Sequence, residues 1–218
     1  MQESQKPAKG PDKILDLRQA VYLSGHPRVE VCPPDRGVEV AFAGRSNVGK
    51  SSLINALCER RSLARTGAAP GRTRLLHFFA IDDTCRLVDL PGYGFARASK
   101  AERAGWQRMV EGYLQSRRSL ARLMLLMDVR HPLRDSDQQL LEWCSSANLP
   151  VHVLLNKADK LSRSKAQRVL TELRGELRRE GEPPISLVSA RTGLGLEAVR
   201  DALRTYLSGD ETSVPVDC

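Results

Sequence analysis

Two hydrophobic patterns alternate along the chain between residues 38 and 207. Short apolar runs that are bounded by Gly, Pro, Asp or Asn predict buried strands, whereas longer segments with apolar residues at i, i+3, i+4 and i+7 predict amphipathic helices. We expect strands at 38–43, 75–81, 85–90, 121–128, 151–156 and 185–189. We expect helices at 50–59, 101–116, 136–147, 164–179 and 196–207. This alternation predicts an α/β fold in which helices wrap a mostly parallel sheet.

One pair of strands breaks the parallel pattern. Residues 75–81 and 85–90 are separated only by Asp82, Asp83 and Thr84, and a link this short cannot hold a crossover helix. The pair therefore predicts a hairpin, and hence one antiparallel strand in the sheet. Residues 1–36 are expected to form a polar tail and an irregular lead-in, with room for one short helix or edge strand. Residues 37–208 form the predicted domain, and 209–218 a second tail.

Composition narrows the class of protein. No run of eighteen apolar residues exists, so no transmembrane helix or stable membrane association is expected, and the polar N-terminus predicts a cytoplasmic location. The five cysteines and four histidines are scattered, which argues against a zinc site or a disulfide framework. A net charge of +8 favours a polyanionic partner, either nucleic acid or an anionic membrane surface.

The most specific motif lies between the first strand and the first helix. Residues 44–51 read G-x-x-x-x-G-K-S, which is typical of a phosphate-binding loop. Its glycines allow backbone N–H groups to converge at a helix N-terminus, where an anion binds. Lys50 is expected to contact the outer phosphates, and Ser51 offers a hydroxyl to Mg²⁺.

A second motif follows the predicted strand at 85–90. Asp89-Leu90-Pro91-Gly92 reads D-x-x-G, in which the carboxylate can reach the Mg²⁺ shell and the glycine N–H can meet a γ-phosphate. Between the two motifs lies a basic, glycine-rich segment, residues 67–74, where Thr73 is a candidate second Mg²⁺ ligand.

The third motif indicates which base is bound. Asn156-Lys157-Ala158-Asp159 reads N-K-x-D and follows an apolar strand. The Asp159 carboxylate can accept hydrogen bonds from guanine N1–H and N2, whereas adenine offers no donor at either place and would leave the carboxylate unpaired. Ser189-Ala190 follows the last strand, and a backbone N–H there can meet guanine O6.

All of these motifs follow predicted strands in one order, so they are expected at the carboxyl edge of the sheet, where ligands of open α/β sheets bind. The sequence therefore predicts a GTP-binding domain. The candidate GTP-binding residues are Gly44, Arg45, Ser46, Asn47, Val48, Gly49, Lys50, Ser51, Gly71, Arg72, Thr73, Arg74, Leu75, Asp89, Leu90, Pro91, Gly92, Asn156, Lys157, Ala158, Asp159, Val188, Ser189 and Ala190. Lys50, Thr73 and Gly92 are the candidate catalytic residues. Ser51 and Thr73 are candidate direct Mg²⁺ ligands, and Asp89 would act through water.

The chain resembles the EngB family of ribosome-associated GTPases, within the translation-factor-like P-loop GTPases. The stretches that carry the resemblance are residues 40–55, 70–73, 88–94, 128–130 and 157–161, of which Pro-Gly-Arg-Thr and Leu-Pro-Gly-Tyr-Gly are the most family-specific. Asn156 is a departure, because family members often carry Thr there. The resemblance implies a Ras-like G domain with a six-stranded mixed sheet and helices on both faces. It also implies a role in assembly of the large ribosomal subunit, with rRNA and ribosomal proteins as partners, and in cell division and septation.

The resemblance also raises two points of mechanism. Tyr93 stands where many switch GTPases place a glutamine that orients the attacking water, so slow intrinsic hydrolysis is expected. Asn47 occupies a loop position at which related GTPases bind K⁺, so K⁺ is a further candidate cofactor. We expect a monomer.

Two other interpretations stay open at this point. The chain could be a basic RNA-binding scaffold with a vestigial phosphate loop, in which case replacing Lys50 would leave its binding unchanged. It could also be an ATPase or nucleotide kinase, although the N-K-x-D motif argues against adenine.

Overall fold

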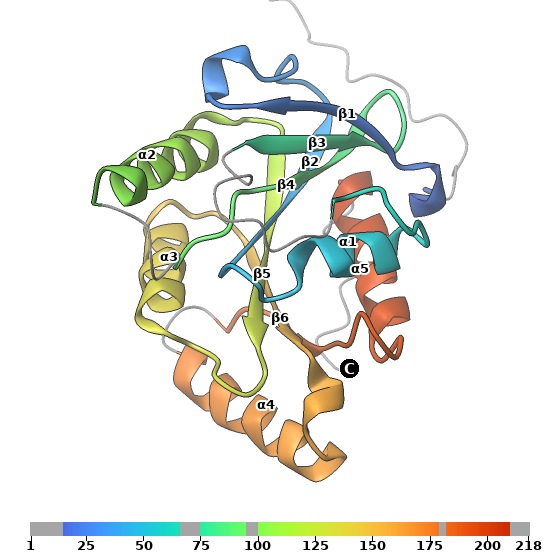
Figure 1. The fold of residues 1–218 in the computed structure, drawn as a ribbon, viewed down its shortest axis with the longest axis vertical. Coiled ribbons are helices and arrows are strands. Elements are labelled where there is room, and N and C mark those ends of the chain that lie inside the picture. The colour runs from blue at the N-terminus through green and yellow to red at the C-terminus, as the bar shows by residue number, and fades with distance from the viewer. Residues whose placement is uncertain (1–14, 66–74, 95–99, 179–181, 210–218) are drawn as a thin grey trace, which may run out of the picture.

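A single sheet of seven strands forms the centre of the computed structural model of this chain (Figure 1). The structure describes residues 15–65, 75–94, 100–178 and 182–209, and it describes no side chains for residues 100–103. The strands are β1 (Val21–His26), β2 (Val38–Gly44), β3 (Leu76–Ala80), β4 (Cys85–Asp89), β5 (Leu120–Asp128), β6 (Val151–Asn156) and β7 (Ile185–Leu187). The helices are α1 (Lys50–Leu57), α2 (Lys100–Ser116), α3 (Asp135–Ser146), α4 (Arg163–Leu177) and α5 (Leu196–Ser208). Short 3₁₀ turns lie at Leu17–Gln19, Val29–Val31 and Ala158–Lys160.

The order of the strands is β1-β3-β4-β2-β5-β6-β7. Strands β4, β2, β5, β6 and β7 pair in parallel, whereas β3 runs antiparallel to both of its neighbours, β4 and β1. The predicted hairpin and the single antiparallel strand are therefore confirmed. Every helix and strand expected from the hydrophobic pattern is present, with boundaries shifted by at most two residues.

The expected count of six strands is wrong by one, because β1 adds a seventh at the edge of the sheet. The first three residues of β1 are exposed, and its pairing with β3 shifts register between Tyr22 and Ser24. An exposed edge strand with a bulge has no reason to alternate polar and apolar residues. The hydrophobic pattern therefore allows an edge strand in the lead-in but does not predict one, and β1 lies there.

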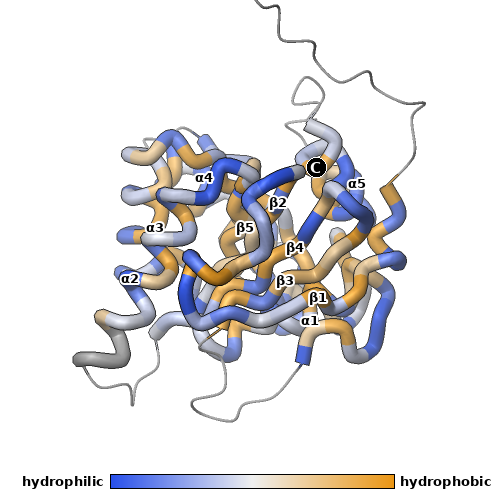
Figure 2. Tube along the Cα trace, turned by 90° about the horizontal axis from the view of Figure 1, so that it is seen from above, coloured by the Kyte–Doolittle hydropathy of each residue, from blue (hydrophilic) through white to orange (hydrophobic). Residues whose placement is uncertain are grey.

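Each face of the sheet carries its own hydrophobic core. Helices α2, α3 and α4 pack on one face, against side chains that include Ala41 and Val88, and α1 and α5 pack on the other, against Val40 and Leu87. Successive residues of β2 and β4 point to opposite faces because the side-chain period of a strand is two. Figure 2 shows the hydrophobic residues concentrated along the central strands.

The lead-in belongs to the second of these cores. Leu17 and Ala20 are buried among residues of α1 and α5, so the chain that precedes β2 contributes both a strand and core side chains.

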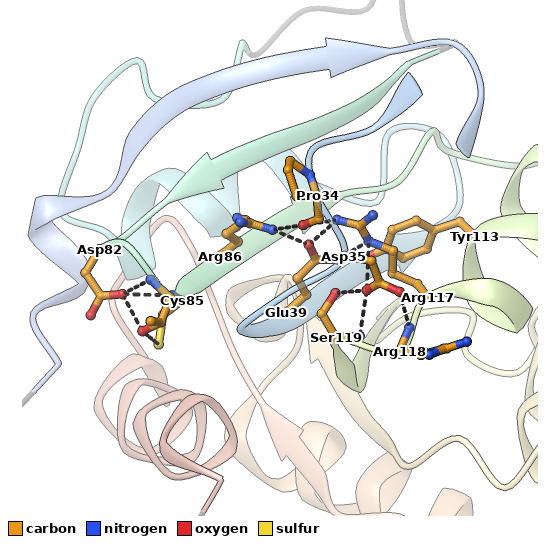
Figure 3. A network of polar contacts seen from close by, with 11 residues as sticks. Pro34, Asp35, Glu39, Asp82, Cys85, Arg86, Tyr113, Arg117, Arg118 and Ser119 are labelled. Carbon is orange, nitrogen blue, oxygen red and sulfur yellow. Dashed lines mark hydrogen bonds and ion pairs between the residues drawn. The ribbon is translucent and has the colours of Figure 1, made fainter. Parts of the chain in front are cut away.

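A buried polar cluster closes the amino end of β2 (Figure 3). Glu39 is fully buried, and its carboxylate accepts hydrogen bonds from Arg86 Nη1 at 3.0 Å, Arg117 Nη2 at 2.7 Å and the Tyr113 hydroxyl at 2.9 Å. Arg86 also donates to the Pro34 carbonyl at 3.0 Å. The cluster thus joins the lead-in, two strands and the C-terminal end of α2.

Candidate nucleotide-binding site

The phosphate loop occupies the turn between β2 and α1. Gly49 is the residue before the helix and has a φ of 101°, a left-handed conformation that favours glycine. A Cβ at Gly49 would lie 2.6 Å from Asn156 Nδ2, so space as well as backbone conformation selects glycine here. The loop is therefore shaped by its contact with the end of β6, a strand far along the chain.

Two charged side chains meet at the start of α1. Lys50 and Asp89 are both buried, at 7% and 3% exposure, and form an ion pair. The Ser51 hydroxyl lies 3.4 Å from the other carboxylate oxygen of Asp89. The loop lysine, the loop serine and the D-x-x-G carboxylate are thus brought together as the sequence predicted.

The D-x-x-G segment is joined to the phosphate loop by backbone hydrogen bonds. Tyr93 N–H donates to the Gly44 carbonyl at 3.3 Å, and Ser46 N–H donates to the Tyr93 carbonyl at 2.8 Å. A Cβ at Gly92 would lie 3.2 Å from Ser46 Oγ and 3.3 Å from Ser46 N. This close approach favours glycine at position 92 and places its backbone against the loop.

The side chain of Tyr93, which follows Gly92, is buried and hydrogen-bonded within the protein. The side chain is 4% exposed, and its hydroxyl donates to Asp137 Oδ1 at 2.6 Å. Burial raises the pKa of Tyr93 well above its usual value and also raises the pKa of Asp137. The Tyr93 hydroxyl therefore stays protonated, and its proton is used in the hydrogen bond to Asp137. The sequence singled out Tyr93 but gave no signal for Asp137, which is one polar residue among several at the start of a helix.

The end of β6 is fastened to the phosphate loop by two side chains of the N-K-x-D motif. Asn156 Nδ2 donates to the Val48 carbonyl at 2.9 Å, and Lys157 Nζ donates to the Asn47 carbonyl at 2.7 Å. Lys157 also forms an ion pair with Asp128, at 3.1 Å. Asp128 ends β5 and was not predicted as a site residue, although it lies in one of the family-like stretches.

The carboxylate of Asp159 is oriented by the last strand. Ser189 Oγ donates to Asp159 Oδ1 at 2.7 Å, and Ala158 N–H donates to the Val188 carbonyl at 3.1 Å. The hydrogen bond from Ser189 is the main cause that lowers the pKa of Asp159. Asp159 is therefore ionised at neutral pH and presents acceptor atoms only.

Among the described residues of this site, two buried polar atoms have no hydrogen-bond partner. The described residues contain four buried side-chain polar atoms without a hydrogen bond, and Ser46 Oγ and Asn156 Oδ1 are two of them. Such atoms are rare in folded proteins because each costs free energy, and they indicate a place where a ligand or water completes the bonding.

The structure covers most, but not all, of the predicted site. Gly71, Arg72, Thr73 and Arg74 lie outside the described residues, and Leu75 directly precedes β3. Of the metal candidates that are described, Ser51 and Asp89 supply a hydroxyl and a carboxylate close to the lysine of the loop. Such oxygen ligands suit Mg²⁺, so the residues present fit this ion.

A mostly parallel α/β sheet that carries a phosphate loop, D-x-x-G and N-K-x-D on one edge defines a P-loop GTPase. Residues 39–157 match the family described as "50S ribosome-binding GTPase". The "Probable GTP-binding protein EngB" of Histophilus somni is 44% identical over 195 residues, which cover 89% of this chain and 96% of that protein. The protein of the same name from Haemophilus influenzae is also 44% identical, with 89% and 95% coverage. This chain belongs to the EngB family of GTP-binding proteins and is a GTPase of that family.

Solved structures agree on the fold. The crystal structure of a probable GTP-binding protein engB is 23% identical and superposes with a TM-score of 0.65, covering 79% of this chain and 100% of that one. A point variant of Aquifex aeolicus Era bound to GDP and AlF4⁻ is 24% identical with a TM-score of 0.62, covering 84% of this chain and 61% of that one.

Within the described residues, no helix is both long and apolar enough to cross a bilayer. No group of three or more His, Cys, Asp or Glu residues in that part of the chain is arranged to hold a metal ion.

Proposed function

We propose that this GTPase is a nucleotide-dependent switch that acts in assembly of the large ribosomal subunit and thereby supports cell division and septation. The switch is supported by hydrogen bonds that join the D-x-x-G and N-K-x-D motifs directly to the phosphate loop. Tyr93 and Ser46 link the γ-phosphate side to the loop, and Asn156 and Lys157 link the base side to the same loop. The ribosomal role is supported by the description of the matched family and by the net charge of +8, which suits rRNA. Its place of action would be the cytoplasm, as a monomer.

The phosphate end of the site would bind as follows. Lys50 would contact the β- and γ-phosphates, and Mg²⁺ would be held by the hydroxyls of Ser51 and Thr73 directly and by Asp89 through water. When bound, Mg²⁺ supplies charge neutralisation for phosphoryl transfer. Entry of the nucleotide would require Lys50 to exchange part of its pairing with Asp89 for phosphate oxygens, since both are buried in contact with each other.

Gly92 N–H would meet the γ-phosphate. When that phosphate leaves, contacts at Thr73 and Gly92 are lost, and this is the event that a ribosomal partner would read.

The base end of the site would select guanine. Asp159 is ionised and held by Ser189, so it offers acceptors to the two donors of guanine. Asp159→Asn is expected to lower GTP affinity about 30-fold and to favour xanthosine triphosphate, since one carboxylate acceptor becomes a donor. Calorimetric titration with GTP, XTP and ATP measures this. An unaltered preference in Asp159→Asn would refute the assignment, and equal wild-type binding of GTP and ATP would refute guanine selection itself.

Hydrolysis would be slow in the isolated protein. Tyr93 donates its hydroxyl to Asp137 and is buried, so it does not replace the glutamine that orients water in other GTPases. Single-turnover hydrolysis should therefore be accelerated by large ribosomal subunits. Asn47 is the candidate K⁺ contact, and equal turnover in KCl and NaCl would remove K⁺ from the scheme.

Sedimentation with ribosomal subunits tests the ribosomal role. We expect co-migration with the large subunit that is stronger with a non-hydrolysable GTP analogue than with GDP or without nucleotide. Co-migration that ignores the nucleotide contradicts the switch, and the absence of any co-migration contradicts the ribosomal assignment.

A further inference from the structure

The residues on either side of Gly92 are each held by a side chain from a different helix. Trp106 of α2 donates its Nε1–H to the Pro91 carbonyl at 2.7 Å. Asp137 of α3 accepts the hydroxyl of Tyr93 at 2.6 Å. The rings of Tyr93 and Trp106 also contact each other, with centroids 5.4 Å apart. Gly92 therefore sits in a segment whose two flanks are anchored outside the phosphate loop.

The anchor on the α3 side is buried and makes two bonds. Asp137 is 1% exposed, its Oδ1 accepts from Tyr93, and its Oδ2 accepts from Arg134 N–H at 3.0 Å. The second of these bonds caps α3. One carboxylate thus performs two separable tasks, which are to fix the start of a helix and to fix the tyrosine that follows D-x-x-G.

The position of Tyr93 determines that of Gly92 through the backbone. Tyr93 is bonded to Gly44 and Ser46 by its N–H and carbonyl, and its phenol is bonded to Asp137. With both its backbone and its side chain fixed, Tyr93 holds the C-terminal side of Gly92, and the bond from Trp106 to the Pro91 carbonyl holds the peptide that carries the Gly92 N–H. Because the Gly92 N–H is already held in place, little conformational entropy is lost when its ligand binds.

We infer that Asp137 is a positioning residue for γ-phosphate recognition, which acts through Tyr93 to hold the Gly92 peptide against the phosphate loop. This inference rests on the proposed function, in which Gly92 N–H meets the γ-phosphate. GDP has no γ-phosphate, so the link between Tyr93 and Asp137 affects GTP binding and not GDP binding. In this role the carboxylate touches no part of the nucleotide.

The two tasks of Asp137 can be separated by mutation. Tyr93→Phe removes the link and leaves the cap of α3 intact. Asp137→Asn can keep an acceptor for the Tyr93 hydroxyl while it gives up the acceptor for Arg134 N–H. Asp137→Ala removes both. A positioning role therefore predicts opposite behaviour for the first two variants.

The measurement is the dissociation constant of GDP and of a non-hydrolysable GTP analogue, by calorimetry, together with the melting temperature. In Tyr93→Phe and Asp137→Ala we expect the affinity for the GTP analogue to fall about tenfold, the equivalent of one buried hydrogen bond, with GDP affinity unchanged. In Asp137→Asn we expect the ratio of the two affinities to stay near that of the wild type and the melting temperature to fall.

Tyr206→Phe is the matched control. Tyr206 is also a buried tyrosine, at 3% exposure, whose hydroxyl is hydrogen-bonded to a side chain, His152 Nδ1 at 2.9 Å. It belongs to α5 and lies outside the nucleotide site. Removal of the Tyr206 hydroxyl should lower the melting temperature without changing the ratio of GTP to GDP affinity.

The outcomes separate this inference from the proposed function. If Tyr93→Phe weakens both nucleotides equally, or neither, the positioning role is wrong. If Asp137→Ala does not fold, Tyr93→Phe still tests the positioning role, because it leaves the cap of α3 in place. If the wild-type protein binds neither guanine nucleotide, it is the proposed function that fails, before any variant is compared.

Discussion

Two buried acidic groups lie near opposite ends of strand β2, yet their surroundings differ. At the amino end, Glu39 is surrounded by Arg86, Arg117 and Tyr113, and its contacts are all made within the protein (Figure 3). Beside the carboxyl end, Asp89 faces Lys50, and two buried polar atoms of the same site have no hydrogen-bond partner in the part of the chain that the structure describes.

This difference separates a stabilising cluster from a binding site. A buried charge whose hydrogen bonds are all made has nothing left to offer a ligand, and its removal affects folding. A buried group beside unpartnered atoms keeps binding capacity, at some cost in stability. Substitutions at the amino end should therefore change the free energy of unfolding, and those at the carboxyl end should change nucleotide affinity.

Glu39→Gln should have the largest effect. It removes the carboxylate that two buried guanidinium groups share, those of Arg86 and Arg117, whose side chains are 7% and 5% exposed. Breaking a buried ion pair in this way costs about 3–5 kcal/mol of unfolding free energy. Urea denaturation measures the loss, and nucleotide affinity of the remaining folded protein should not change.

The matched control is Glu172→Gln on the surface of α4. Glu172 pairs with Arg168 one turn away, but both side chains are more than half exposed. Its loss should cost well under about 1 kcal/mol. A similar loss in both variants would contradict the special role of the buried cluster.

Lys50→Ala should have the next largest effect, near the other end of the strand. Under the proposed function Lys50 contacts the phosphates, so loss of that charge-assisted bond should lower the affinity for GTP and GDP by about 100-fold. Because Lys50 does not read the base, the ratio of GTP to XTP affinity should stay constant. Filter binding or calorimetry measures both. Unchanged nucleotide binding would favour the alternative of an RNA-binding scaffold with a vestigial loop.

The stability of the protein should fall in acid because of a histidine on β6, the strand that precedes the N-K-x-D motif. His152 of β6 is buried, with its ring bonded to Tyr206 and Ser186, and burial lowers its pKa from 6.5 to about 4. Below pH 6.5 His152 binds a proton in the unfolded state but stays neutral in the folded state. The free energy of unfolding therefore falls as the pH drops towards 4. The loss between about pH 7 and pH 5 should be about 2 kcal/mol from this residue.

Urea denaturation at both pH values tests the assignment, with His152→Gln as the comparison. The variant is expected to be less stable at neutral pH but to lose less stability on acidification than the wild type. An equal pH slope in both proteins would show that other groups carry the acid sensitivity.

Ser51→Ala should have the smallest effect. It removes one hydroxyl close to Asp89 and leaves the pairing of Lys50 with Asp89 in place. Affinity for GTP in the presence of Mg²⁺ should fall about tenfold, since the proposed Mg²⁺ site loses one oxygen ligand. With EDTA the wild type and the variant should bind alike. A persistent difference in EDTA would mean that Ser51 contacts the nucleotide without the metal.

The sequence could predict most of this molecule because periodic and local signals define most of it. Strands and helices show their own hydrophobic periods, and the topology of parallel strands brings their following motifs to one edge. The meeting of Lys50 with Asp89 and of Asp159 with Ser189 follows from that rule.

The remaining features depend on contacts that no local pattern encodes. Strand β1 owes its place to pairing with β3 rather than to any alternation of its own residues. Asp137 is recognisable only once α3 is packed beside Tyr93, since the two residues are 44 positions apart. Glu39 looks like an ordinary polar residue in a strand until Arg86 and Arg117 are seen around it.

The placement of the lead-in has a practical consequence for shortened versions of the protein. Leu17 and Ala20 fill a core, and β1 covers the outer edge of β3. A version that starts at residue 37 would expose a strand edge rich in phenylalanine, at Phe78 and Phe79. Open edges of this kind recruit further strands. Trimming the chain to the segment that carries the motifs would thus favour self-association.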